Sequence, residues 1–227
     1  MKFELQRGVI VIDAAVIFDL DGTLLYTLED IKDALNRTLK KYDLPGVGIE
    51  EVRKNIGNGS RVLLIKSTPS SISDNEVDDM LKDYLADYAE NCNVKTKPYA
   101  GITDAIVAIR NKGYRVAVVS NKPDDATKSL VRTYFGGLVD VAVGETKEIK
   151  RKPAPDTINK VIKDLGIDKK ASYYVGDSEV DIEASKNADI RCLSVSWGFR
   201  SSEQLKKAGA VEIIDSPEEL VDKVINN

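Results

Sequence analysis

The sequence contains no histidine and only two cysteines. The absence of histidine excludes Ser-His-Asp and Cys-His nucleophilic catalysis and every metal site with a histidine ligand. Acid–base chemistry must therefore fall to Asp, Glu, Lys, Tyr or Cys side chains. Cys92 and Cys192 lie far apart and offer neither a disulfide framework nor a Cys-x-x-Cys zinc motif. This cysteine usage is typical of the reducing cytoplasm, where we expect the protein to be located.

Long apolar runs and clustered positive charge are also missing. No stretch approaches the roughly 20 apolar residues that span a bilayer, and the apolar run at residues 9–12 is too short for a signal peptide. The formal net charge of −4 argues against nucleic acid as a partner, because binding to phosphate backbones needs clustered Lys and Arg. We expect a monomer or homodimer that binds neither nucleic acid nor membrane.

What the sequence does contain is a regular alternation of short apolar runs and helical patterns. Strands are expected at residues 14–18, 116–119, 139–143, 173–175, 192–195 and 211–214. Strands that alternate with helices imply a Rossmann-like parallel sheet with helices on both faces, which is an α/β fold. Residues 3–12 are expected to add an edge strand or a hairpin arm.

Residues 27–96 show helical spacing and no clear strand. We therefore expect an α/β core domain formed by residues 1–26 and 97–227, with an inserted all-helical cap domain at residues 27–96. Insertions at strand tips commonly act as lids. Tyr84 and Tyr88 belong to an apolar stripe that we expect in the interior of the cap.

The segment at residues 14–25 carries the strongest functional signal, because a buried strand runs directly into Asp19 and Asp21. In open α/β sheets, ligands bind just beyond the carboxyl ends of the strands. Two carboxylates placed two residues apart point to a common side. There they can ligate a hard cation such as Mg²⁺, or one of them can attack phosphorus. An ordinary Asp-x-Asp-Gly surface turn is the alternative, and three segments downstream argue against it.

Four predicted strands are followed by residues suited to phosphoryl transfer: Asp19, Ser120 and Asp177 at the ends of their strands, and Lys152 in the region after the third strand. Asp19 is the candidate nucleophile, and Asp21 is the candidate acid that protonates the leaving oxygen and then activates water. Asp19, Asp21 and Asp177 are candidate ligands of Mg²⁺, which would neutralise charge around the phosphoryl group. Ser120 and Lys152 are expected to contact that group.

These segments resemble the four motifs of the haloacid dehalogenase superfamily of phosphohydrolases. Asp-Leu-Asp-Gly-Thr at 19–23 resembles the first motif, Ser120-Asn121 the second, Lys152-Pro153 the third, and Gly-Asp-Ser-Glu-Val-Asp at 176–181 the fourth. The resemblance covers nearly the whole chain, including the helical cap. It implies a magnesium-dependent phosphatase that acts through an aspartyl phosphate on Asp19, with Gly22, Thr23 and Asn121 among its phosphate-binding residues.

Within this superfamily the chain is similar to phosphoglycolate phosphatases. The similarity lies in the Gly-x-Gly loop at 57–59, in Lys-Pro-Ala-Pro-Asp at 152–156 and in Ser-Val-Ser-Trp-Gly-Phe-Arg at 194–200. It implies a small phosphomonoester substrate, with 2-phosphoglycolate as the first candidate. Inorganic pyrophosphate and sugar phosphates are alternative substrates. A non-catalytic sensor of a phosphorylated ligand is a third possibility, because a fold does not determine a function.

Three further residues each keep two interpretations. Gly59 belongs either to an anion-binding turn of the cap or to a simple connection between cap helices. Arg61 either binds a carboxylate or phosphate of the substrate or is a solvated arginine of the cap. Asp181 has two interpretations as well. It either contacts the metal ligands or Lys152 and holds them in position, or it only places a negative charge at a helix N-terminus.

One departure from the subgroup lies at the junction with the cap, where Tyr26-Thr27 stands in place of the usual Asp-Ser. This departure is expected to affect cap closure or substrate fit.

Overall fold

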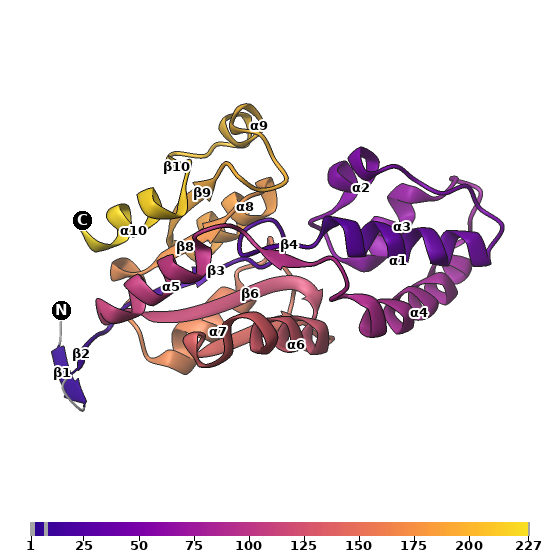
Figure 1. Cartoon of the computed structure of the whole chain (residues 1–227). Helices are drawn as coiled ribbons and strands as arrows, with labels where there is room; N and C mark the ends of the chain where they lie inside the picture. The colour runs from indigo at the N-terminus through magenta and orange to yellow at the C-terminus, as the bar shows by residue number, and fades with distance from the viewer. Residues whose placement is uncertain (1–2, 7–8, 227) are drawn as a thin grey trace.

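The computed structural model describes residues 3–6 and 9–226, and its centre is a parallel sheet (Figure 1). The strands are β3 (Ala15–Phe18), β6 (Arg115–Pro123), β7 (Val141–Glu145), β8 (Tyr173–Gly176), β9 (Arg191–Val195) and β10 (Ile213–Ile214). Their order is β10-β9-β8-β3-β6-β7, and all neighbouring pairs are parallel. The predicted α/β fold with a parallel sheet is therefore confirmed, and β3 lies inside the sheet between β6 and β8.

Helices cover both faces of the sheet because the side chains of β3 alternate between two hydrophobic cores. Val16 and Phe18 belong to a core that includes residues of α5 (Ile102–Asn111), α6 (Asp124–Phe135) and α10 (Pro217–Ile225). Ala15 and Ile17 belong to a second core with residues of α7 (Asp156–Leu165) and α8 (Glu179–Ala188). The remaining helices of this part are α9 (Ser202–Lys207) and two 3₁₀ turns, Gly136–Leu138 and Lys169–Ala171.

Four helices lie together beyond one end of the sheet, on the right of Figure 1. They are α1 (Leu28–Lys41), α2 (Ile49–Asn55), α3 (Ser60–Ser67) and α4 (Asp74–Asn91), and we call them the cap. The expected inserted all-helical cap is thus present, and a capping box formed by Ser73 and Glu76 starts α4. The domain boundaries at 26/27 and 96/97 stay a prediction.

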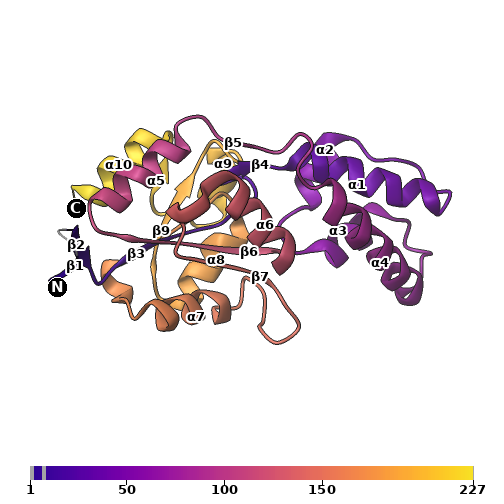
Figure 2. The same ribbon diagram turned by 60° about the horizontal axis from the view of Figure 1, so that its bottom comes forward.

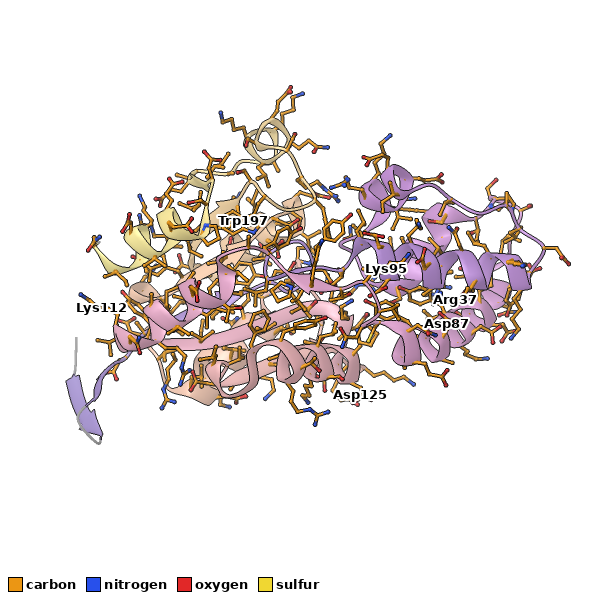
Figure 3. All side chains as sticks on the ribbon, in the orientation of Figure 1. Arg37, Asp87, Lys95, Lys112, Asp125 and Trp197 are labelled. Atoms are coloured by element: carbon orange, nitrogen blue, oxygen red, sulfur yellow. The ribbon has the colours of Figure 1, made fainter. Side chains whose placement is uncertain are left out.

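The chain enters and leaves the cap at one place. The short strands β4 (Leu25–Tyr26) and β5 (Lys97–Pro98) pair antiparallel there. Asp30 of α1 is buried beside them, and its carboxylate accepts hydrogen bonds from the backbone N–H groups of Val94, Lys95 and Thr96. Figure 3 shows Lys95 at this junction. Asp30 therefore fastens the returning chain to the first turn of the cap.

The helices of the cap are held together more by the packing of buried apolar side chains than by ion pairs. Leu35 and Met80 are fully buried between α1 and α4. Arg37 and Asp87 form a bidentate ion pair on the surface of the same two helices (Figure 3). Exposed pairs of this kind contribute only about 0–1 kcal/mol to stability, so the buried apolar contacts hold the cap together.

Some element ends differ from the sequence-based prediction. β6 continues through Ser120 to Pro123, with an irregular register after Val119. The strand was predicted to end at residue 119, but polar residues that follow it, such as Asn121, are buried and hydrogen-bonded, so tertiary contacts override the local preference. β10 is shorter than predicted.

At the other end of the sheet, β1 (Phe3–Gln6) and β2 (Val9–Ile12) pair antiparallel, which is the expected hairpin arm. In the view of Figure 2 this arm lies on the far side of the sheet from the cap. None of the helices formed by the described residues is both long enough and apolar enough to span a bilayer.

Candidate active site

The predicted site residues meet at the carboxyl edge of the sheet. Phe18 is in register with Val118 and Val175, so the residues that follow on β3, β6 and β8 lie side by side. The backbone N–H of Asp19 donates to the carbonyl of Val175 at 2.8 Å. A pocket between this edge and the cap is lined by Asp19, Asp21, Ser120, Asn121, Lys152 and Asp177 on the core side.

Lys152 lies at the centre of the buried polar network and is only 2% exposed. Its Nζ donates to Asp19 Oδ1 at 2.8 Å, to Asp181 Oδ1 at 2.7 Å and to Tyr174 Oη at 2.9 Å. Burial alone lowers the pKa of Lys152, but the charges of Asp181 and Asp19 outweigh it and raise this pKa above its ordinary value. The ammonium group therefore stays charged beside Asp19.

Three carboxylates, those of Asp19, Asp177 and Asp181, each place an oxygen within 4.8 Å of the others. Burial, and then the charge of Asp181, raises the pKa of Asp19 well above its usual range, although Lys152 opposes the shift. Burial and Asp181 likewise raise the pKa of Asp177 to about 7. This concentration of buried negative charge, offered by oxygen donors, fits a hard divalent cation such as Mg²⁺.

Gly22 and Thr23 are brought to Asp177 rather than to the surface of the pocket. Thr23 Oγ1 donates to Asp177 Oδ1 at 3.1 Å, and the N–H of Phe199 donates to Asp177 Oδ2 at 2.7 Å. Gly22, at φ +87°, and Gly198 pack so closely on Asp177 that neither position has room for a Cβ. These four residues hold the Asp177 carboxylate in place.

Asp21 lies outside the group of three carboxylates, although it lines the same pocket. Its Oδ1 accepts a hydrogen bond from Thr27 Oγ1 at 2.7 Å and lies 3.0 Å from Lys122 Nζ. Lys122 is 5% exposed, donates to Tyr88 Oη and lies over the Tyr88 ring, 4.4 Å from its centre. Lys122 is not among the site residues predicted from the sequence, although it stands only two residues after Ser120.

Asn121 connects three parts of the site through its amide. Its Nδ2 donates to the carbonyls of Lys152 at 2.9 Å and of Gly57 at 3.0 Å, and its Oδ1 accepts from the N–H of Lys152 at 2.8 Å. In this structure the side chain therefore holds the Lys152 loop and the cap instead of facing the pocket with a free donor. The hydroxyl of Ser120 accepts a hydrogen bond from the N–H of Lys122 and lines the pocket.

The structure separates the two predicted cap residues. Gly59 lines the pocket together with Gly57, and both have positive φ. Arg61 turns away from it, because its guanidinium pairs with Asp74 and Asp78 of α4 at 2.8 Å each. Its geometry therefore matches the interpretation as a solvated cap arginine.

The contacts of Asp181 and of the cap tyrosines Tyr84 and Tyr88 can be compared with the expectations for these residues. Asp181 shows both proposed contacts: Oδ1 accepts from Lys152, and Oδ2 accepts from the N–H and hydroxyl of Ser178 in the capping box of α8. Tyr84 and Tyr88 are buried in the cap as predicted, and they also line the pocket.

Comparison with known proteins gives a consistent result. A family model described as haloacid dehalogenase-like hydrolase matches residues 16–195. The chain is 36% identical over 185 residues to a phosphoglycolate phosphatase of Aquifex aeolicus, a match that covers 81% of this chain and 85% of the relative. It is 31% identical over 210 residues to the N-acetylmuramic acid 6-phosphate phosphatase of Pseudomonas aeruginosa, covering 92% and 93% of the two chains.

Solved structures agree with the sequence comparisons. A crystal structure from Lactobacillus delbrueckii subsp. bulgaricus, provisionally named a phosphoglycolate phosphatase, superposes with a TM-score of 0.88 at 35% identity. That match covers 94% of this chain and 98% of the other.

Proposed function

The chain belongs to the haloacid dehalogenase-like hydrolase family and is a phosphoric monoester hydrolase, and we propose that its substrate is 2-phosphoglycolate. The observation that carries this proposal is that two buried lysines, Lys122 and Lys152, line one pocket beneath the cap. A small ester with both a phosphate and a carboxylate offers two anionic groups to such a pocket.

The cap side of the pocket favours a small substrate over a sugar phosphate. Ile31, Ile56, Leu63 and Tyr84 line it, and Arg61 points elsewhere. The hydroxyl groups of a sugar would be buried against these apolar side chains, and a polar group buried without a hydrogen bond costs about 1–3 kcal/mol. Glycolate has fewer polar groups that need a hydrogen-bond partner in the pocket.

In the proposed mechanism, a carboxylate oxygen of Asp19 attacks phosphorus, and the bond from phosphorus to the ester oxygen breaks. Lys152 holds Asp19 in position, and its charge stabilises the phosphoryl oxygens together with the hydroxyl of Ser120. Asp21 gives a proton to the leaving alcohol. It then takes a proton from the water that attacks the aspartyl phosphate, which releases inorganic phosphate and restores Asp19.

We propose that Asp19 and Asp177 hold Mg²⁺, since their carboxylates lie together and Thr23 and Phe199 fix the second of them. When bound, the ion supplies positive charge that reduces the repulsion between a carboxylate and a phosphoryl group. Asp181 orients Lys152. A ligand role for Asp21 stays a prediction, because its side chain is engaged by Lys122 and Thr27.

Mg²⁺ is expected to raise the melting temperature of the wild-type protein by about 5–10 °C at a hundredfold excess over its dissociation constant, which corresponds to about 2.7 kcal/mol. Asp177→Asn is expected to show two opposite effects. It should stabilise the metal-free protein, because a buried carboxylate with a raised pKa is removed, and it should lose most of the Mg²⁺ shift. Thermal unfolding with and without Mg²⁺ measures both effects.

Asp189→Asn is the matched control, since Asp189 is exposed and pairs with Lys170 on the surface. It should keep the full Mg²⁺ shift. Trp197, the single tryptophan, donates from Nε1 to the carbonyl of Thr23 and provides an independent fluorescence signal near Asp177. An Asp177→Asn protein with the wild-type Mg²⁺ shift would contradict the assignment of this ligand.

The substrate is tested by comparing kcat/KM for 2-phosphoglycolate, N-acetylmuramic acid 6-phosphate, a hexose 6-phosphate and pyrophosphate. We expect 2-phosphoglycolate to be preferred at least about tenfold, the ratio that corresponds to about 1.4 kcal/mol. A preference for the amino sugar would favour the second candidate, which the 31% identical Pseudomonas aeruginosa phosphatase supports. A preference for pyrophosphate, or binding without phosphate release from any of them, would contradict the proposal.

A further inference from the structure

Arg200, in the loop after β9, hydrogen-bonds the backbone of the cap. It is 7% exposed. Its Nη1 donates to the carbonyl of Arg53 at 2.6 Å and its Nη2 to the carbonyl of Ile56 at 3.1 Å. Both carbonyls belong to the end of α2, where the last turn of a helix lacks partners of its own. A residue of the core thus caps a helix of the inserted domain.

The residues that follow α2 contact the core at a second place. The carbonyl of Gly57 accepts a hydrogen bond from Asn121, which also holds the Lys152 loop. Two residues further on, Gly59 packs on Glu145 and Arg151, which form an ion pair. Core side chains therefore fix the stretch that leads into the Gly-x-Gly loop of the pocket.

Arg200 is itself fixed from the core side by Glu179. Its Nε donates to Glu179 Oε2 at 2.8 Å, and its Nη2 also donates to Glu179 Oε1 at 3.1 Å. Glu179 begins α8, two residues after Asp177. These contacts occupy four of the five N–H donors of the guanidinium, which leaves little capacity for a substrate group.

We propose that Arg200 is a positioning residue that docks the cap on the core, holding Gly57 and Gly59 over the phosphoryl pocket. The proposal rests on this pocket being the catalytic site, as proposed above, but not on the identity of the substrate. Arg200 links the helix after Asp177 to the loop that covers it, so docking of the cap and completion of the site occur together.

The test compares Arg200→Lys with a matched control, Arg110→Lys. Lysine keeps the positive charge but cannot reach two carbonyls with a planar fork. Arg110 makes the same kinds of contact, donating to the carbonyl of Leu138 and pairing with Asp140, but Asp140 precedes β7 at the amino edge of the sheet. Only Arg200→Lys should increase amide hydrogen exchange at residues 53–60 of the full chain, by about tenfold or more.

Kinetics give the second measurement. With Mg²⁺ present, kcat/KM of Arg200→Lys should fall about 10- to 100-fold for both 2-phosphoglycolate and ethyl phosphate, mainly through KM, because docking favours the substrate and transition-state complexes alike. A fall confined to 2-phosphoglycolate would make Arg200 a ligand of the substrate carboxylate and overturn the proposal. Unchanged exchange at residues 53–60 would also overturn it.

The exchange measurement needs no substrate, so it decides about docking even if 2-phosphoglycolate proves to be the wrong ester. If Arg200→Lys fails to unfold cooperatively, Glu179→Gln replaces it, because this change loosens the guanidinium without removing it. The same rise in exchange at residues 53–60 is then expected, and its absence contradicts the docking role.

Discussion

Asp19→Asn is expected to reduce the hydrolysis of 2-phosphoglycolate on the order of 10⁶-fold, the loss typical of removing a nucleophile. An amide oxygen is a poor nucleophile and cannot form the aspartyl phosphate. The fold should persist, because the amide has nearly the shape of the carboxylate and burial already raises the pKa of Asp19. Phosphate release at saturating Mg²⁺ measures the effect.

Asp189→Asn serves as the control for this substitution. Asp189 is exposed, pairs with Lys170 and has φ +54°, a conformation that asparagine also tolerates. Its turnover should equal that of the wild type.

Wild-type protein quenched in acid during turnover should carry phosphate on the peptide that contains Asp19, and Asp19→Asn should carry none. Turnover of Asp19→Asn within tenfold of the wild type would show that another group attacks phosphorus.

The core of this site was predictable from sequence because parallel strands bring their carboxyl ends to a common edge. Asp19, Ser120 and Asp177 each follow an apolar run, and the registers of β3 with β6 and β8 place them side by side regardless of their separation in the chain. Lys152 lies in the loop after β7 and reaches the same point. Strand periodicity and the position of polar residues after each strand carried this information.

Contacts between the core and the cap were not predictable in the same way. The direction of Arg61 depends on Asp74 and Asp78 of a neighbouring helix, which local spacing does not reveal. The pairing of Lys122 with Tyr88 depends on where the cap lies over the sheet. The amphipathic pattern of α4 predicted burial of Tyr88 correctly, but it cannot distinguish a side chain buried in a core from one that lines a pocket.

Within the first motif, the structure shows contacts that the resemblance did not indicate. The resemblance assigned Gly22 and Thr23 to the phosphate; in the structure both pack on Asp177, far away in the sequence, and their contact with the phosphate stays a prediction. A motif shows which residues occur together in a sequence. The contacts in the structure show whether a residue touches the ligand itself or holds another residue that touches it. The same reasoning applies to Asn121, whose amide holds the Lys152 backbone.

Lys152→Met is expected to lower both stability and turnover. Removing the Nζ leaves the buried carboxylates of Asp19 and Asp181 without their cation, and breaking a buried ion pair from one side typically costs about 3–5 kcal/mol. Turnover should fall about 10²- to 10³-fold, the usual loss for one electrostatic group at the reacting centre. Lys128→Met is the control, since Lys128 is exposed and pairs with Asp124; its cost should be below about 1 kcal/mol.

The double variant Lys152→Met with Asp181→Asn separates the two effects. Replacing Asp181 removes one of the unpaired buried charges, so the melting temperature should recover in part relative to Lys152→Met. Turnover should stay low, because the ammonium group that contacts Asp19 and the phosphoryl group is still missing. Thermal unfolding and phosphate release are measured on the wild type, Lys152→Met, Asp181→Asn and the double variant, which together form a double-mutant cycle. If the double variant recovered wild-type turnover together with its stability, Lys152 would be a structural counter-charge of Asp181 and its part in the reaction would be refuted.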